Sequence, residues 1–503
     1  MVATLVHQGI PSCPPEASLT PDHRQAPMIE ALRAYQCAST VSFATPGHKH
    51  GAGFDPEVRA LLGPDLGAAD VWLNTADHDA ALSAAETLAA AAWGADRTFF
   101  LTNGSSGGNH AFLLAALAPG DEVIVGRDLH QSLLTALTLT GARPVYVAPR
   151  LHPELGVGIG IDPAELETAL AAHPAAKLVA VVSPTYWGVA CDVAALVDVA
   201  HRHGVPLYVD GAWGPHFGFH PAFPASPLAG GADAAVTSPH KLLTGLSQAA
   251  MLHVQGERVD AARVASTVVM TRTTSPLLPI LVSLDACRRQ IALGGEVMLE
   301  RAVTLAETAR RRLRAIPGVD LVAADRLGLP PHRVDPTRLV IDVAGLGYTG
   351  IAAERVLRDH HAIAPEMSDL LGLVCLVTPG DSRDTIDRLI AAVAALAGER
   401  RPALSAPASL RSAAAAIAPG AQALTPREAF FAPTRLVTLP EAVGAVAAEP
   451  VTPYPPGIPV LTPGEIVSAE KVDYLCAALA AGIQLRGPAD PALRTIRVVG
   501  GRW

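Results

Sequence analysis

Short apolar runs alternate with Ala- and Leu-rich stretches between about residue 98 and residue 237. Continuous apolar strands separated by helices predict a mostly parallel sheet that helices cover on both faces. Such sheets bind ligands in the loops at the carboxyl ends of their strands. The predicted strands are 98–102, 122–126, 143–148, 177–183, 206–210 and 234–237. The predicted helices of this region are 110–118, 131–140, 163–173 and 193–203.

The pattern changes after this region. A long helical segment, about 281–315, leads into a second set of alternating elements, which predicts a smaller α+β domain. Its elements are a strand at the end of 319–342, a helix near 350–360, a strand at 372–377 and a helix at 384–397. A stretch dense in Ala, Pro and Ser, 399–426, predicts a linker before a small C-terminal domain. The division that follows is an N-terminal arm and helix at 1–45, a large domain at 46–315, the small domain at 316–400, and linker and C-terminal domain at 401–503.

Composition narrows the class of protein. The chain has 503 residues, of which 50% are hydrophobic and 17% charged, so it can bury a large core. The net charge of −9 comes without a long basic run, which argues against nucleic acid and anionic membranes as main partners. Six cysteines are scattered without CxxC pairs, as expected for free thiols in a reducing cytoplasm. The chain shows no signal peptide and no apolar run long enough for a bilayer, so we expect a soluble, cytoplasmic protein.

The first motif with candidate chemistry is TFFLTNGSSGGNH, at 98–110. A strand ends there in a Gly/Ser-rich turn that opens a helix, so free N–H groups and the helix dipole face whatever sits in the turn. This arrangement suits a phosphate, and Ser105 and Ser106 add hydroxyl donors. Plain helix capping is the commoner explanation of such a turn taken alone.

Two charged residues follow at later strand ends. Asp210 closes the run PLYVD, where a buried carboxylate is costly unless it is paired. A pyridinium N–H would be a suitable partner, since pyridoxal-5′-phosphate (PLP) accepts electrons only while that nitrogen is protonated; a metal ligand or a capping aspartate is the alternative. Lys241 follows the run 234–237 in a segment with few other charges, a place that suits a Schiff-base lysine, although a surface lysine is the commoner finding.

The order of these signals is more specific than any one of them. A phosphate turn comes first, then a ring-stacking candidate in His130, then Asp210, then Ser-x-His-Lys ending at Lys241. This is the order that a PLP enzyme of the aspartate-aminotransferase fold, fold-type I, requires. We therefore predict an α/β fold of this type with a mostly parallel sheet in the large domain.

The motifs resemble those of the bacterial Orn/Lys/Arg decarboxylases, a family of fold-type I PLP enzymes. The resemblance covers nearly all of residues 29–470, and several separate motifs recur in the same order. The motifs are TPGHKHGAG (45–53), TNGSSGGNHA (102–111), PGDEVIVGRDLHQS (119–132), SPTYWGV (183–189), YVDGAWGPHF (208–217), GADAAVTSPHKLL (231–243), TTSP (273–276), SLDACR (283–288) and YPPGIPVLTPGE (454–465).

The resemblance implies which residues contact the cofactor. Lys241 would carry PLP as a Schiff base and then act in proton transfer, Asp210 would hold the pyridinium nitrogen, and His130 would stack on the ring. The residues implied to hold the phosphate are Ser105, Ser106, Ser238 and His240. The residues implied to line the rest of the cofactor site are Thr185, near the ring hydroxyl, Ala212 and Trp213.

The resemblance also implies a substrate and an assembly. We expect decarboxylation of a basic amino acid to the amine and CO2, with arginine ahead of lysine and ornithine, in polyamine biosynthesis. Glu366, in IAPEMSD, would lie near the substrate. Thr274 and Ser275 would reach a phosphate across the interface of a homodimer or larger homo-oligomer with shared sites. Another fold-type I reaction, such as transamination, a lyase reaction or an oxygen-consuming decarboxylation, stays open, as does a non-catalytic PLP-binding protein.

Some positions depart from the family pattern. The chain begins close to the core, so we expect neither the receiver-like N-terminal domain of the large members nor a decamer built by it. Leu242 follows Lys241 where many relatives carry Thr, and 70–83 matches poorly, which makes it a candidate for the substrate entrance. His48 and His50 could be read as a metal pair, but no third ligand is near, so we expect no metal site.

Overall fold

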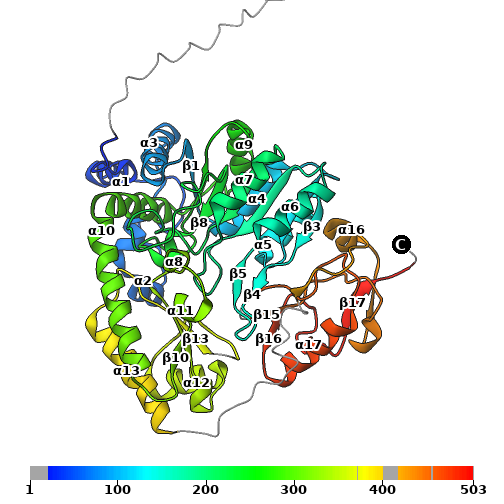
Figure 1. The fold of residues 1–503 in the computed structure, drawn as a ribbon. Helices are drawn as coiled ribbons and strands as arrows, with labels where there is room; N and C mark the ends of the chain where they lie inside the picture. Colours follow the sequence, from blue (N-terminus) through cyan, green and yellow to red (C-terminus); the bar gives the residue numbers. More distant parts are fainter. Residues whose placement is uncertain (1–20, 371, 400–416, 455–456, 502–503) are drawn as a thin grey trace, which may run out of the picture.

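The computed structural model describes residues 21–370, 372–399, 417–454 and 457–501 (Figure 1). Its centre is a seven-stranded sheet of order β1-β9-β8-β7-β6-β2-β3. The four pairings from β8 to β3 are parallel, and β9 pairs antiparallel with both β1 and β8. The strands are β1 (Arg97–Leu101), β2 (Glu122–Gly126), β3 (Arg143–Val147), β6 (Leu178–Val182), β7 (Leu207–Asp210), β8 (Ala234–Thr237) and β9 (Ala250–Val254). The mostly parallel sheet predicted from the sequence is therefore confirmed, with β9 as the strand that the pattern did not reveal.

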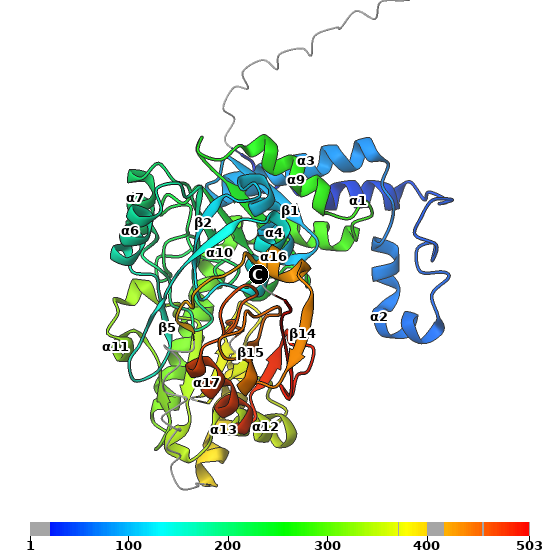
Figure 2. The ribbon, with the colours of Figure 1, turned by 90° about the vertical axis from the view of Figure 1, so that its right-hand side faces the viewer.

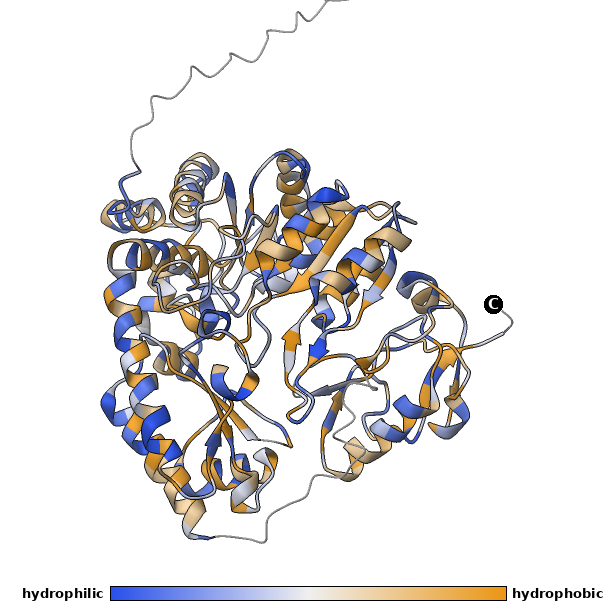
Figure 3. Cartoon of the chain, viewed as in Figure 1, coloured by the Kyte–Doolittle hydropathy of each residue, from blue (hydrophilic) through white to orange (hydrophobic). Residues whose placement is uncertain are grey.

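Helices cover both faces of this sheet because successive residues of its strands point to opposite sides. In β6, Val179 and Val181 pack in one apolar cluster, together with helices α6 and α7, whereas Leu178 and Ala180 pack in a second cluster with α4 and α5. Figure 3 shows the strands as the most apolar part of this layer. The helices that cover the two faces include α4 (Gly104–Ala116), α5 (Gln131–Thr140), α6 (Pro163–Ala172), α7 (Val193–Arg202) and α9 (Ala261–Thr271).

A helix of 37 residues, α10 (Leu278–Arg314), runs from the sheet region to a second unit (Figure 1). Here a four-stranded antiparallel sheet of order β10-β11-β13-β12 packs against α12 (Gly350–His361) and α13 (Arg383–Gly398) around its own apolar core. Its strands are β10 (Asp320–Leu321), β11 (Arg338–Asp342), β12 (Met367–Ser368) and β13 (Gly372–Leu376). This is the predicted smaller α+β unit.

The C-terminal segment forms a third unit beside the large sheet, drawn orange to red in Figure 1. It has a separate apolar core, which includes Val451, Leu461 and Val498. Its elements are α16 (Pro426–Phe431), β14 (Thr434–Val437), β15 (Thr452–Tyr454), α17 (Ala469–Ala480), β16 (Gln484–Arg486) and β17 (Ile496–Val499). The exact domain boundaries at residues 45, 315 and 400 stay predictions.

The N-terminal helices α1 (Pro27–Cys37), α2 (Pro56–Ala69) and α3 (Thr75–Trp93) lie at one side of the sheet. Figure 2 shows α2 and the segment before it standing away from the rest of the chain. Apolar side chains are exposed there, with Phe43 at 95% and Leu61 at 84% of their full accessibility. Within the described part of the chain, no helix is both long and apolar enough to cross a membrane.

Candidate active site

The predicted site residues converge at the carboxyl ends of the parallel strands. Two adjoining pockets open there and share His130, Tyr186, Trp213, Lys241 and Gly457. Predicted residues that line the first pocket are Ser105, His130, Thr185, Asp210, Ala212, Trp213 and Lys241, and those that line the second are His130, Trp213, His240, Lys241 and Glu366. Loops that are far apart in the sequence meet here because parallel strands present their carboxyl ends at one edge.

Asp210 is held by a buried amide. Asn109, on α4, donates from Nδ2 to Asp210 Oδ2 at 2.8 Å, and its Oδ1 accepts the hydroxyl of Tyr208 at 2.6 Å. The backbone N–H of Ala212 donates to the other carboxylate oxygen at 3.2 Å. Asp210 is thus a buried carboxylate whose orientation is fixed.

His130 is joined to the same network through Ser132. Asn109 also donates from Nδ2 to Ser132 Oγ at 2.8 Å, and that hydroxyl lies 2.7 Å from His130 Nδ1. His130 is the N-cap of α5, and its Nδ1 accepts from the backbone N–H of Ser132, so the neutral ring carries its proton on Nε2. Burial lowers the pKa of His130, and the charge of Lys241 adds to this, although Asp210 opposes it.

Lys241 lies on the short helix α8 (Pro239–Leu242), directly after β8. Its Nζ is 3.9 Å from the centre of the Trp213 ring, a cation–π contact. Burial lowers the pKa of Lys241 to about 8, because Arg338 adds repulsion and the attraction of Asp210 and Glu366 offsets only part of the desolvation. A neutral, nucleophilic fraction of this amine therefore exists near neutral pH.

The predicted phosphate-binding turn opens α4, and Asn103 at its N-cap makes no side-chain cap bond. Gly108 is required in this helix, because a Cβ there would lie 2.6 Å from Val236 Cγ2 of β8. Ser105 lines the pocket, and the buried hydroxyl of Ser238 finds no hydrogen-bond partner in the described part of the chain. An orphaned buried donor beside an uncapped helix N-terminus suits a phosphate group.

Glu366 borders the second pocket, where the hydroxyl of Tyr186 donates to its Oε1 at 3.0 Å. The same pocket is lined by residues of the C-terminal unit, among them Tyr454 and Arg486. The guanidinium of Arg486 stacks 3.5 Å from the centre of the Tyr454 ring. Glu366 is the one carboxylate among the residues that line this second pocket.

Three predicted residues are not brought to these pockets in the single chain. Thr274 and Ser275 are exposed on the segment between α9 and α10, and Ser106 is half-buried on α4; none of them lines either pocket. The cross-subunit role of Thr274 and Ser275 needs a second chain and stays a prediction. Residues 70–83 border neither pocket, and most of them belong to α3.

Sequence reasoning missed two groups of site residues. Asn109 and Ser132 stand inside quoted motifs, but no pattern shows that an amide and a hydroxyl would bridge Asp210 and His130. The second group is the pocket wall from the C-terminal unit, which includes Gly457 and Ile458 of the motif YPPGIPVLTPGE. A proline- and glycine-rich segment without an apolar pattern is the only signal that this wall leaves in the sequence.

Comparison with known proteins agrees with this geometry. The chain matches the family model for the Orn/Lys/Arg decarboxylase major domain over residues 26–328 and that for the C-terminal domain over 411–487. It is 38% identical over 484 residues to arginine decarboxylase of Bacillus subtilis (strain 168), covering 94% of this chain and 98% of the relative. Arginine decarboxylase of Bacillus anthracis is 36% identical, with 94% of this chain and 97% of that protein covered.

Solved structures show the same fold at lower identity. Lysine decarboxylase A from Pseudomonas aeruginosa superposes with a TM-score of 0.81 at 22% identity, over 95% of this chain and 81% of that one. L-threonine transaldolase from Pseudomonas fluorescens superposes with a TM-score of 0.53 at 17% identity, over 69% and 77%. These likenesses confirm the predicted α/β fold, and from the two family models and the Bacillus relatives it follows that the chain belongs to the Orn/Lys/Arg decarboxylase family.

Proposed function

We propose that this chain decarboxylates arginine to the corresponding amine and CO2, with PLP as its cofactor. The observation that carries the proposal is the meeting of Lys241, Asp210 and His130 in one pocket of a family decarboxylase. Lys241 has the depressed pKa of a nucleophilic amine, and Asp210 is a buried, oriented carboxylate. Together they are the groups that a Schiff-base cofactor with a pyridine ring requires.

The residues present fit PLP. Lys241 would carry it covalently, Asp210 would pair with its ring nitrogen, and His130 would lie against its ring, with Thr185, Ala212 and Trp213 around it. The phosphate would be held by Ser105, Ser106, Ser238 and His240, among which Ser238 offers an unpaired buried hydroxyl. When bound, PLP supplies an electron sink for the pair released as the bond between Cα and the carboxylate breaks.

The protein's own groups orient the reactants and manage protons. The carboxylate of Asp210, fixed by Asn109, keeps a proton on the nitrogen that it faces. The amine of Lys241, once released, moves a proton at the substrate Cα. The ring of Trp213 and the apolar lining of the first pocket exclude water, which strengthens each of these electrostatic contacts.

Support for arginine comes from the relatives and from Glu366. The Bacillus relatives, 36–38% identical over nearly the whole chain, bear the name arginine decarboxylase. A substrate with a distal cation needs a carboxylate in a partly desolvated pocket, and Glu366, held by Tyr186, is available in the second pocket. A guanidinium can pair with such a carboxylate through two parallel hydrogen bonds, which an ammonium cannot do.

We also propose a homodimer with shared sites. Exposed apolar side chains gather near the N-terminal helices and on the α9–α10 side, including Phe43, Leu61, Met270 and Val297. Apolar surface of this kind marks protein–protein contacts. Thr274 and Ser275 follow α9 directly, so a second chain docked on this side would receive them.

The deciding experiment is a product assay. Purified protein with added PLP is given arginine, lysine, ornithine, glutamate and an aromatic amino acid, and CO2 and amine are quantified together. We expect equal amounts of CO2 and amine, with the largest kcat/KM for arginine. A keto acid or aldehyde product would indicate another fold-type I reaction, and a preference for glutamate would overturn the basic substrate.

A further inference from the structure

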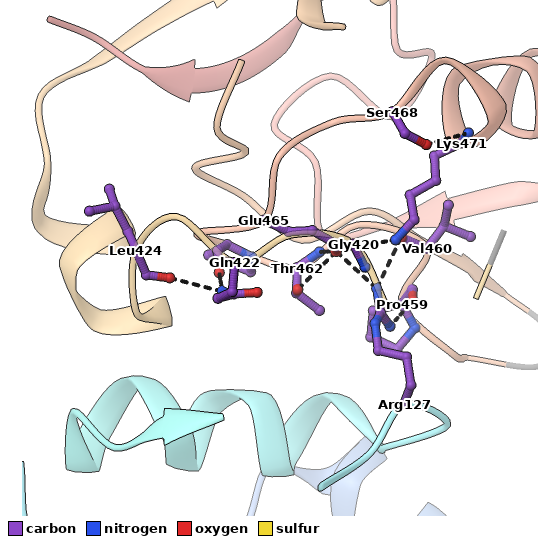
Figure 4. A network of polar contacts seen from close by, with 11 residues as sticks. Arg127, Gly420, Gln422, Leu424, Pro459, Val460, Thr462, Glu465, Ser468 and Lys471 are labelled. Carbon is purple, nitrogen blue, oxygen red and sulfur yellow. Dashed lines mark hydrogen bonds and ion pairs between the residues drawn. The ribbon is translucent and has the colours of Figure 1, made fainter. Parts of the chain in front are cut away.

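A buried ionic network joins the C-terminal unit to the loop that carries His130 (Figure 4). Arg127, directly after β2, has a fully buried guanidinium that donates to Glu465 Oε2 at 3.1 Å. Glu465 is also fully buried, and its other oxygen accepts from Lys471 and from the backbone N–H of Gly420 at 2.8 Å. Burial alone would raise the pKa of Glu465, but the two cations and its hydrogen bonds hold that pKa below the ordinary value.

Arg127 also grips the chain that forms the pocket wall. Its Nη1 donates to the carbonyl of Pro459 and its Nη2 to the carbonyl of Val460 at 3.0 Å. Gly457 and Ile458, the residues directly before these carbonyls, line the first pocket. Arg127 itself stands three positions before His130, which lines the same pocket from the opposite side of the network.

A purely stabilising role explains this network poorly. Burying charges costs desolvation free energy, and apolar residues of similar volume often stabilise a fold as well or better. The apolar core of the C-terminal unit is also separate from the cores of the sheet. What the guanidinium adds is fixed geometry, because its rigid fork holds two carbonyls and one carboxylate at once.

We propose that Arg127 is a positioning residue that holds the C-terminal wall, residues 457–460, against the loop of His130 and so shapes the cavity for the substrate. This inference rests on the proposed assignment of the cavity to cofactor and substrate. It gives the C-terminal unit a direct part in substrate binding. Glu465 and Lys471 act through Arg127, by fixing the guanidinium that meets the two carbonyls.

The chain offers a matched control in Arg427. On α16, its Nη1 donates to the carbonyl of Leu139 at 2.9 Å, so it links the same two units at the opposite end of α5. It is exposed, and neither pocket includes it. Arg127→Met and Arg427→Met therefore remove one inter-unit arginine each, one beside the pocket and one away from it. Arg127→Met also leaves Glu465 paired with Lys471, so the buried charges stay balanced.

The first measurement is hydrogen–deuterium exchange of the PLP-loaded protein over residues 457–462. We expect faster exchange there in Arg127→Met and wild-type exchange in Arg427→Met. The second is steady-state kinetics with arginine, where the KM of Arg127→Met should rise about tenfold or more, with a smaller change in kcat, because the wall is misplaced. Should Arg127→Met not fold, Arg127→Lys repeats both measurements, since a lysine keeps the charge but cannot hold all three partners.

Unchanged exchange over 457–462, or an equal KM rise in both arginine variants, overturns the proposal in favour of general domain docking. An absence of arginine turnover in the wild-type protein would instead fall on the proposed function. The exchange measurement then still decides the role of Arg127, because it needs no substrate.

Discussion

Asn109 donates a hydrogen bond to Asp210 at 2.8 Å, and the same amide nitrogen donates to Ser132 at the same distance. One helix residue thus orients the carboxylate under the ring nitrogen site and, through Ser132, the imidazole of His130. Removing it leaves a buried carboxylate short of one partner while both neighbours keep their own backbone contacts. Asn109 is therefore the residue through which the two halves of the cofactor site are held in register.

Replacing Asn109 by Ala should lower kcat while PLP still binds. Loss of a hydrogen bond to a charged group costs about 1.5–3 kcal/mol, which corresponds to roughly a ten- to hundredfold decrease in rate. Steady-state kinetics beside the visible spectrum of bound cofactor measures this. Ser132→Ala is the control, since it breaks only the branch to His130 and should cost less. A wild-type kcat in Asn109→Ala would remove Asp210 orientation from the mechanism.

Lys241→Ala should abolish both the covalent cofactor and the activity. The wild-type protein should be yellow, and borohydride should bleach it into an adduct on Lys241 that peptide mass spectrometry locates. Lys177→Ala, at an exposed lysine before β6, should behave as wild type. An adduct on any other lysine would contradict the proposed chemistry.

Glu366→Gln should raise the KM for arginine, because the amide cannot balance the guanidinium charge. A charged hydrogen bond of about 1.5–3 kcal/mol predicts roughly a ten- to hundredfold rise. Tyr186→Phe, which removes the donor to Glu366 but keeps its charge, should raise the KM less. Equal KM values in wild type and Glu366→Gln would show that another carboxylate, such as one supplied by a second subunit, binds the guanidinium.

Two inactive variants, Lys241→Ala and Ser275→Trp, should regain partial activity when their subunits are mixed. A mixed dimer would pair an intact Lys241 with an intact Ser275 in one of its two sites. Activity before and after mixing, with light scattering to follow the assembly, checks this. A fully active monomer would refute the shared site.

The strand-end residues could be predicted from the sequence because the apolar runs mark the strands clearly. Asp210 closes one such run and Lys241 follows another, and parallel strands bring both to one edge. The end of β2 and the motif after it placed His130 in the same way. These inferences depend only on local patterns and on the rule that sheet strands present their carboxyl ends together.

The remaining contacts could not be predicted because no local pattern encodes them. Asn109 and Asp210 are 101 positions apart, and Arg127 meets Pro459 across 332 positions. Such pairs follow from how separate units dock, which depends on the packing of whole surfaces. The strand β9 was missed for a related reason, since it joins the sheet antiparallel at an edge that the alternating pattern does not describe.

The pH dependence of PLP uptake tests the electrostatics of Lys241. Its pKa is lowered to about 8, mainly by burial, so the neutral amine that attacks the cofactor is the minor form below pH 8 and the major form above it. The rate of PLP uptake by the cofactor-free protein should therefore rise about tenfold from pH 7 to pH 9 and then level off. An ordinary lysine would keep gaining up to about pH 10.4. Arg338 repels the charged amine and Glu366 attracts it, so Arg338→Met should move this profile to higher pH and Glu366→Gln should move it to lower pH. A rate that climbs without a plateau to pH 10 would show that the pocket does not lower the pKa of Lys241.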